Sequence, residues 1–475
     1  MKNLNRRPGM LPGAVQSKSV GPPLHPGLKK RLSMVLMLLA LPFVVAVSLH
    51  AQKSRAGQPV IATGTQSSAP DALYLDVAEV DPNPNDDICK RIANTWHAFG
   101  QLNGANADSA VIDARSIRSA PPATTLACDS DPFMDPVTKL TTSHHGVLLL
   151  GNQLIQTTVP WMIPSFIQVE GLGETLTSKN AYNTTLQAAP NYSYGGYIGN
   201  PTICAANSLV CLGHGVQSFR AQIRHLTVDC NFVNSCIGVY NGAAEEGSYA
   251  QDVTITNAPA AGLEVNLAQF TGGGGGMYNG AVNSGPYRNI TIDFTGSCAN
   301  ICTASTVGVL VENTGSMSNY GGVVRAFDGV TVSGANAGAT LGQGILIEGA
   351  STQVTNSHVE YFPTSIQIGA DGVVTNGVEL ANLFLSNTNT GTGVSIVQDQ
   401  ASLKTGDVFI TGLNFEGPEY AVIDQVGGKS LKDCFIAIYA VGHMSGSSNA
   451  VVISTSPYVA GGHNSVPTGP QGCKQ

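Results

Sequence analysis

The chain has 475 residues, of which 11% are charged and 55 are glycine, and its formal net charge is −8. So few charges and so much glycine favour an all-β protein over a helical one. Residues 1–51 hold seven bases and no acid, which leaves 16 bases and 31 acids in the remainder, a net charge of about −15. An acidic body lacks the basic footprint that nucleic acid requires, so no nucleic-acid partner is expected.

A basic leader precedes an apolar stretch, Leu32–Leu49, which is followed closely by Ala51 and Gln52. This order is typical of a secretory signal peptide with a small residue at the cleavage point. The apolar stretch is long for that role, so an uncleaved membrane anchor stays open. Residues 1–51 therefore predict export, with the body secreted, periplasmic or held at the cell envelope. Residues 52–80 are small and polar and predict a flexible linker.

All ten cysteines follow residue 51, an even number for an oxidising compartment. The pattern predicts three short-range disulfides and leaves four cysteines for longer-range pairing: Cys204/Cys211, Cys230/Cys236 and Cys298/Cys302, with Cys89, Cys128, Cys434 and Cys473. Buried free thiols are the alternative. A zinc site is disfavoured because CxxC spacing is absent, and no metal site is predicted elsewhere.

One helix is predicted over residues 86–103. Asp86 or Asp87 can cap its start, and apolar residues recur at helical spacing from Ile88 to Phe99. Because a long β region follows, we expect this helix to cover the open first edge of a stack of strands.

From residue 110 the apolar period is two. A unit with an apolar–Thr–apolar centre recurs, and a second strand follows each copy after a Gly-containing turn. The clearest copies are IRHLTVDC (223–230), AQDVTITN (250–257), YRNITIDF (287–294) and FDGVTVSG (327–334). Such repetition indicates a solenoid, because propeller signatures and frequent hairpin turns are missing. We therefore predict an all-β fold, a parallel β-helix, over residues 81–445 and a C-terminal tail over 446–475.

The opening coils resemble those of the pectate-lyase-like right-handed parallel β-helix superfamily. The resemblance rests on DARSI at 113–117 and on GVLLLGNQLIQTTVPWMIPSFIQVEGLGETLTSKNAYNTTLQAAP at 146–190, and it covers about 86–445. It implies a right-handed parallel β-helix. The chain also resembles exported bacterial β-helix proteins whose membership implies no particular reaction.

The first candidate site is a carboxylate pair on the second strands. Equivalent residues of successive coils lie about 4.8 Å apart in a parallel stack. Alignment places Asn266, Glu312 and Glu348 on one outward ladder. The two carboxylates would repel, which raises one pKa and gives an acid–base couple at the spacing of a retaining glycosidase. Two solvated acids on an exposed strand face are the alternative.

A second candidate set lies on the apolar–Thr–apolar strands. Asp229 and Asp293 are expected two coils apart, near the upper end of the separation for a general acid and a general base. Arg224 and Arg288 share another ladder position, and the two Asp residues flank them. Solvated residues on a strand face are again the alternative.

Two aromatic residues, Phe384 and Phe409, are predicted at the outward Thr position of weaker coils. Exposed aromatic rings there can stack on sugar rings and so bind a polysaccharide. A covering loop is the other explanation for them.

The known catalytic motifs of the resembled superfamily are not matched. Polygalacturonase-type hydrolases carry Asn-Thr-Asp, Asp-Asp, Gly-His-Gly and Arg-Ile-Lys on successive coils. Here Gly213-His214-Gly215 stands alone before the main coils. Pectate lyases use an Arg or Lys base with calcium held by several Asp residues, and no dense Asp cluster occurs. No cofactor is therefore expected, with calcium left open as the alternative.

The sequence thus leads to an exported, monomeric β-helix protein that binds or cleaves a polysaccharide, as a lyase or a glycoside hydrolase. It leaves catalysis undecided. The alternative is a non-catalytic cell-surface or adhesion scaffold, which the poor match to catalytic motifs favours.

Overall fold

The computed structural model describes residues between Leu73 and Gly461: 73–103, 109–118, 125–173, 183–192, 204–214, 218–242, 244–266, 269–271, 277–279, 284–294, 302–312, 326–334, 342–348, 352–370, 375–386, 391–397, 405–416, 420–424, 436–439, 444–445, 453–454 and 460–461. The predicted leader at 1–51 lies outside these residues, as do Cys298, Cys434 and Cys473.

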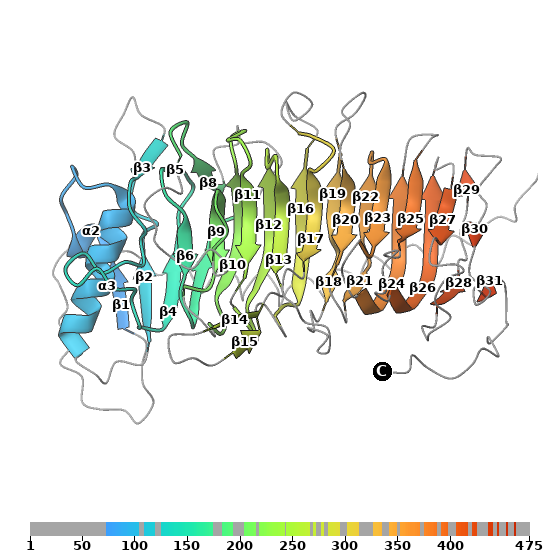
Figure 1. Cartoon of the computed structure of the whole chain (residues 1–475). Helices are drawn as coiled ribbons and strands as arrows, with labels where there is room; N and C mark the ends of the chain where they lie inside the picture. Colours follow the sequence, from blue (N-terminus) through green and yellow to red (C-terminus); the bar gives the residue numbers. More distant parts are fainter. Residues whose placement is uncertain are drawn as a thin grey trace, which may run out of the picture. The chain divides into compact units, whose positions relative to one another are not determined.

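The described chain winds into coils of three short strands, and equivalent strands of successive coils pair in parallel (Figure 1). A hydrogen-bonded set of 19 strands bends along its length into a first and a second sheet, and ten further strands form a third sheet. The prediction of an all-β, right-handed parallel β-helix is confirmed.

The first sheet holds the first strand of each coil, and the second sheet holds the second. Strands of the first sheet alone are β1 (Leu73–Asp76), β2 (Ala110–Asp113), β4 (Gly146–Leu149), β7 (Ile167–Glu170), β18 (Phe327–Asp328), β21 (Gln353–Thr355), β28 (Ile436–Tyr439) and β31 (Ala460–Gly461). Strands of the second alone are β3 (Thr125–Cys128), β5 (Gln153–Thr157), β8 (Thr184–Ala188), β19 (Thr331–Ser333), β22 (His358–Glu360) and β29 (Met444–Ser445). Five strands run through both: β10 (Gln222–Asp229), β12 (Tyr249–Thr256), β16 (Tyr287–Asp293), β24 (Thr375–Ser386) and β26 (Thr405–Glu416).

The third sheet closes each coil. Its strands are β6 (Trp161–Ile163), β9 (Ser208–Leu212), β11 (Ile237–Asn241), β13 (Ala261–Asn266), β17 (Val307–Glu312), β20 (Gln343–Ile347), β23 (Thr364–Ile368), β25 (Thr392–Ile396), β27 (Tyr420–Asp424) and β30 (Ile453–Ser454). A separate antiparallel pair, β14 (Gln269–Thr271) and β15 (Met277–Asn279), lies in the connection after β13.

The bend between the first and second sheets has one left-handed residue per coil. In β10 the segment before His225 pairs with β7, and the segment after it pairs with β8. His225 has φ 52°, and equivalent positions of later coils also have positive φ: Asp252, Asn289, Gly329, Asn356, Asn382 and Gly412. Asn, Asp and Gly tolerate this conformation best, so the residue before each apolar–Thr–apolar unit sets the bend. Each strand that the sequence predicts as one unit therefore contributes its first half to the first sheet and its second half to the second sheet.

Inward side chains from all three sheets form one continuous apolar core, which includes Ile223 of the first sheet, Val228 of the second and Val239 of the third. The Thr ladder is confirmed in register, since Thr227 pairs with Thr254. Both hydroxyl side chains are nevertheless buried, at 2% and 3% exposure. The outward face of the second sheet is therefore not open to solvent at these two coils.

Helix α3 (Ile88–Asn103) packs on the first coils beside the short helix α2 (Val77–Val80) (Figure 1). Asp87 caps it by accepting the backbone N–H groups of Cys89 and Lys90 at 2.9 and 3.0 Å. Its apolar stripe, from Ile88 to Phe99, joins the core of the β-helix. The predicted capping role follows, because these side chains cover apolar residues of β2 and β3.

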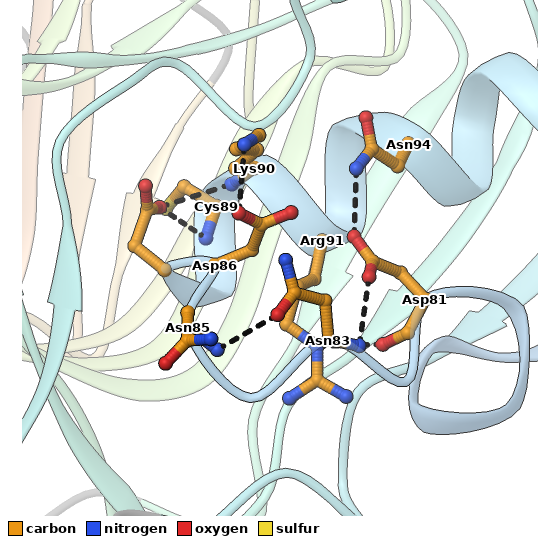
Figure 2. A network of polar contacts seen from close by, with 9 residues as sticks. Asp81, Asn83, Asn85, Asp86, Cys89, Lys90, Arg91 and Asn94 are labelled. Carbon is orange, nitrogen blue, oxygen red and sulfur yellow. Dashed lines mark hydrogen bonds and ion pairs between the residues drawn. The ribbon is translucent and has the colours of Figure 1, made fainter.

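Polar contacts fix the entry into α3 (Figure 2). Asp81 is central: its Oδ2 accepts from Asn94 Nδ2 at 2.6 Å, and its carbonyl oxygen accepts from Arg91 Nε at 2.8 Å. Asp86 pairs with Lys90 at 2.7 Å one turn along the helix. The acidic start of the helix is thus tied to the segment that leads from α2.

Three disulfides are formed among the described residues, and two of them are predicted short-range pairs: Cys204–Cys211 and Cys230–Cys236. The third, Cys89–Cys128, ties α3 to β3. Cys302 is also disulfide-bonded. Disulfides of this kind persist in oxidising compartments.

Two predicted boundaries are wrong. Residues 73–80 belong to the fold rather than to the linker, because β1 extends the first sheet by pairing with β2 and buries Leu73 and Leu75 partly against the core. The predicted tail contains β30 and β31, which continue the pairing of β27 and β28. Neither α2 nor α3, the helices of the described chain, has the length and apolarity to cross a bilayer.

Candidate functional site

Three glutamates gather on the outward side of the third sheet. Asn266 of β13 pairs in register with Glu312 of β17, as predicted. Glu348 follows β20 directly, and its backbone N–H donates to the carbonyl oxygen of Val311 at 2.7 Å. This contact aligns Glu348 with Glu312 on adjacent coils. Since side chains alternate along a strand, Glu264 projects to the same side as Asn266.

Glu312 is the centre of this group. Its Oε2 accepts a hydrogen bond from Asn266 Nδ2 at 3.0 Å. Its side chain also hydrogen-bonds with that of Glu264. Glu264 is only 8% exposed, whereas Glu312 and Glu348 are half-buried. A solute can therefore reach Glu312 and Glu348, whereas Glu264 is buried on the same outward face and contacts Glu312.

The electrostatics of the three carboxyl groups separate their roles. Burial, with the charge of Glu312 and the hydrogen bond to it, raises the pKa of Glu264 to about 8. Burial also raises the pKa of Glu312, while the hydrogen bond from Glu264 acts in the opposite direction. The pKa of Glu348 is raised by burial and then by the charge of Glu312. The deeper burial of Glu264 and the hydrogen bond that Glu312 accepts from Asn266 both favour the proton of the pair on Glu264, with Glu312 as the carboxylate.

Glu264 is the member of this group that sequence reasoning missed. The strand GLEVN (262–266) was aligned through its Asn266, but the period of two places Glu264 on the same face. Its register partners are Tyr240 and Leu310, so no carboxylate shares its ladder. Comparison of diagonal neighbours on adjacent strands, in addition to directly paired residues, would have found it.

Asp229 and Asp293 are two coils apart through Thr256, as expected. Asp229 is 4% exposed. Its carboxylate accepts three hydrogen bonds: from Asn231 N at 2.8 Å, Asn257 Nδ2 at 2.8 Å and Gln187 Nε2 at 2.7 Å. These contacts occupy Asp229 in holding coils together. The structure does not bring it into an open pair with Asp293.

Arg224 and Arg288 share one ladder through Gln251, as predicted. This ladder is in the first sheet, whereas Asp229 and Asp293 are in the second. The left-handed bend at His225 separates the two sets, so the expectation that the aspartates flank the arginines in one site is not met. Instead Arg224 is in register with Glu170, and Arg288 with Asp328.

The two aromatic candidates are exposed but lie in different sheets. Phe384 pairs with His358 on the predicted Thr ladder and is 37% exposed. Phe409 pairs with Glu379, before the bend, and is 43% exposed. The placement of Phe409 on the Thr ladder is therefore wrong, because Gly412 forms the bend three residues later. The two rings do not form one ladder.

Among the described residues, no group of three or more His, Cys, Asp or Glu side chains is placed to hold a metal ion.

The sequence matches no family model and no curated protein. Similar solved structures include a tailspike protein mutant of E. coli bacteriophage HK620 in complex with pentasaccharide, at 11% identity and a TM-score of 0.42 over 82% of this chain and 67% of that chain. The catalytic domain of a GH87 alpha-1,3-glucanase in complex with tetrasaccharides has 10% identity and a TM-score of 0.39, over 85% and 70%. A polygalacturonase from Erwinia carotovora has 10% identity and a TM-score of 0.34, over 74% and 100%. Likeness at this level carries no argument about the reaction of this chain, which has to come from its own residues.

Proposed function

We propose that this protein is an exported glycoside hydrolase that binds a polysaccharide along the third sheet and cleaves it with retention of configuration. The observation that carries the proposal is the hydrogen-bonded pair Glu264–Glu312 beside Glu348 on the next coil. The body, residues 81–445 with β1 and α2 added, is proposed to act as a monomer outside the cytoplasm, where its disulfides persist.

Each carboxyl group has a distinct role in this mechanism. Glu312 is kept ionised by the proton of Glu264 and the amide of Asn266, so it is the nucleophile. Glu348 has a raised pKa and is reachable, so it is the general acid. Residues on adjacent coils lie about 4.8 Å apart, close to the roughly 5–5.5 Å between the carboxyl groups of retaining enzymes.

The proposed hydrolysis has two steps. Glu348 donates its proton to the glycosidic oxygen while Glu312 attacks the anomeric carbon, and the carbon–oxygen bond to the leaving sugar breaks. Glu348, now a carboxylate, removes a proton from water. The resulting hydroxide displaces Glu312 and restores both groups. Glu264 touches neither reacting atom and is a positioning residue for Glu312.

The charge of the site favours a neutral chain as substrate. The Glu312 carboxylate would repel a uronate group at the point of cleavage, and the body of the protein is acidic. We therefore place neutral polysaccharides ahead of acidic ones, and hydrolysis ahead of a lyase reaction. Calcium has no part in the proposed steps.

A panel of neutral and acidic polysaccharides tests the proposal. Incubation with a neutral member is expected to release reducing ends, and proton NMR of the first product is expected to show the anomer of the substrate. Absorbance of an unsaturated uronate product would instead indicate a lyase. Release of the opposite anomer would contradict the assignment of Glu312 as nucleophile.

A non-catalytic scaffold is the second candidate, and one observation favours it. Outward polar side chains of the second sheet bond to one another: Gln156 Nε2 donates to Gln187 Oε1 at 2.7 Å, and Gln187 donates in turn to Asp229. Such side chains are committed to neighbouring coils rather than to a substrate. Binding of a polysaccharide without any product would favour this candidate.

The pH dependence of stability tests the protonated state of Glu264. In the folded protein Glu264 keeps its proton up to a pKa of about 8. In the unfolded chain it releases this proton near the ordinary pKa of 4.5. The free energy of unfolding should therefore fall as pH rises from about 4.5 toward 8. Glu264→Gln keeps an N–H donor for Glu312 and removes this titration, so its melting temperature should decline less over that interval. The exposed Glu79→Gln is the control, and an unchanged decline in Glu264→Gln would contradict the assignment.

A further inference from the structure

A cavity lies away from the glutamate group, between α3 and the segment that follows β3. Its volume is about 190 Å³, and its lining residues are Trp96, His97, Asp135, Thr138, Leu140, Thr141, Thr142, Ser143 and His144. Leu140 and Ser143 are exposed, so the cavity is accessible from solvent. The volume is below the roughly 300–1,000 Å³ of pockets for drug-sized ligands, which suits a ligand no larger than a monosaccharide.

One wall carries an imidazole that is held by a carboxylate. His97 Nδ1 lies 2.7 Å from Asp135 Oδ2. The other oxygen, Oδ1, accepts the backbone N–H groups of Val137 and Thr138 at 2.8 and 2.7 Å. Burial raises the pKa of Asp135, but these three contacts and a fourth from the Thr138 side chain outweigh it and lower the pKa to about 2. An ionised Asp135 accepts the Nδ1–H of His97 and so leaves Nε2 for another partner.

Trp96, the residue before His97 on α3, also lines the cavity. The indole N–H of Trp96 is buried and has no hydrogen-bond partner among the described residues, and the Trp96 side chain is 2% exposed. A buried N–H without a partner destabilises the fold unless water or a ligand accepts from it. The cavity is therefore lined by Trp96, whose indole N–H lacks a partner in the described part of the chain, and by the imidazole of His97.

The Gly-His-Gly sequence connects to this cavity rather than to the glutamate group. Thr141 lines the cavity, and its Oγ1 lies 2.6 Å from Nδ1 of His214. Burial lowers the pKa of His214 to about 4, so this ring is neutral near pH 7. His144 packs edge-on against Phe99 with ring centroids 5.0 Å apart, and burial lowers its pKa as well. The lowered pKa values of His214 and His144 therefore keep these two rings from offsetting the charge of Asp135 at neutral pH.

From this arrangement we infer that the cavity is a binding site for a neutral, polyhydroxylated ligand of monosaccharide size. Hydroxyl groups both donate and accept, so one such ligand can bond with the imidazole of His97 and with the hydroxyl groups of Thr138 and Thr141. An anion is disfavoured by the fixed charge of Asp135. The inference does not rest on the proposed hydrolase activity, since the site shares no residue with the glutamate group.

Proton–nitrogen NMR of the full-length protein tests this site directly. The chain has two tryptophans, and Trp161 donates its indole N–H to Cys128 Sγ at 3.2 Å. Trp161→Phe assigns the two indole resonances. Titration with D-glucose, D-galactose and N-acetyl-D-glucosamine is expected to shift the Trp96 resonance in a saturable way with at least one sugar, and to leave the Trp161 resonance in place. Glucuronate is the charged comparison.

Two substitutions at Ser143 provide the matched control. Ser143→Phe fills the cavity from its exposed side and should weaken sugar binding by about tenfold or more, whereas Ser143→Ala should retain it. The Trp161 resonance reports whether each variant is folded. The double variant Glu312→Gln, Glu348→Gln should bind as the wild type does, which separates this site from the hydrolase proposal. The inference is overturned if no neutral sugar shifts Trp96, if glucuronate binds more tightly, or if Ser143→Phe binds unchanged.

Discussion

Replacement of Glu348 by Gln is expected to lower kcat on the responding polysaccharide by about 10²–10⁴-fold, the range for loss of a general acid. The amide cannot donate a proton to the glycosidic oxygen, although it retains the size of the side chain. KM should change little, because Glu348 acts on charge that develops during bond cleavage. The measurement is the initial rate of release of reducing ends.

A substrate with a good leaving group separates the two catalytic roles. A dinitrophenyl glycoside needs no proton for departure, so Glu348→Gln should form the glycosyl-enzyme on it at nearly the wild-type rate. Glu312→Gln lacks the nucleophile and should be inactive on both substrates. If the activated substrate rescues Glu312→Gln but not Glu348→Gln, the two assignments are reversed.

The matched control for these variants is Asp293→Asn, an outward acid of the second sheet. Its activity should stay near that of the wild type, because the glutamate group lies on the third sheet. Loss of activity in Asp293→Asn together with full activity in Glu348→Gln would move the site to the second sheet.

The period of two along the strands was enough to predict the fold and the alignment of two site residues, Glu312 and Glu348. The alignment of Glu312 with Glu348 follows from inward Val311 and Ile347, whose apolar pattern is readable in the sequence. The role of Glu264 was not readable in the same way, because its burial and its contact with Glu312 depend on the three-dimensional packing of neighbouring coils.

The error over Arg224 and Asp229 has a local cause. An eight-residue strand was expected to keep one face, but His225 turns the chain with positive φ in its middle. The equivalent positions of later coils include Asp252 and Asn289. Asp and Asn adopt positive φ more readily than most residues, so their presence indicates the bend, which hydrophobic periodicity does not. A single left-handed residue thus assigns the two halves of each strand to different sheets and decides which polar groups meet.

The third sheet depends on a second repeated feature, a glycine near the start of each of four strands: Gly238, Gly262, Gly308 and Gly344. A Cβ on Gly308 would lie 2.3 Å from Cγ1 of Val332 and 2.4 Å from the carbonyl oxygen of Gly344. The first contact is with the second sheet, and the second is with the next coil. Absence of a side chain therefore lets the third sheet approach the second sheet of the next coil and stack closely on that coil's own third-sheet strand.

Gly308→Val is accordingly expected to lower the free energy of unfolding by about 4 kcal/mol or more, at the upper end of single substitutions. Thermal melting followed by circular dichroism measures the effect. Leu310→Val, two residues along the same strand and half-buried on its outward side, is the control and should cost less than about 1.5 kcal/mol. Val332→Ala removes one of the two clashes, so it should restore part of the stability of Gly308→Val while the contact with Gly344 keeps the recovery incomplete. A Gly308→Val protein that melts as the Leu310→Val control does would show that the third sheet can move away from the second, and the close approach would then not be required for the fold.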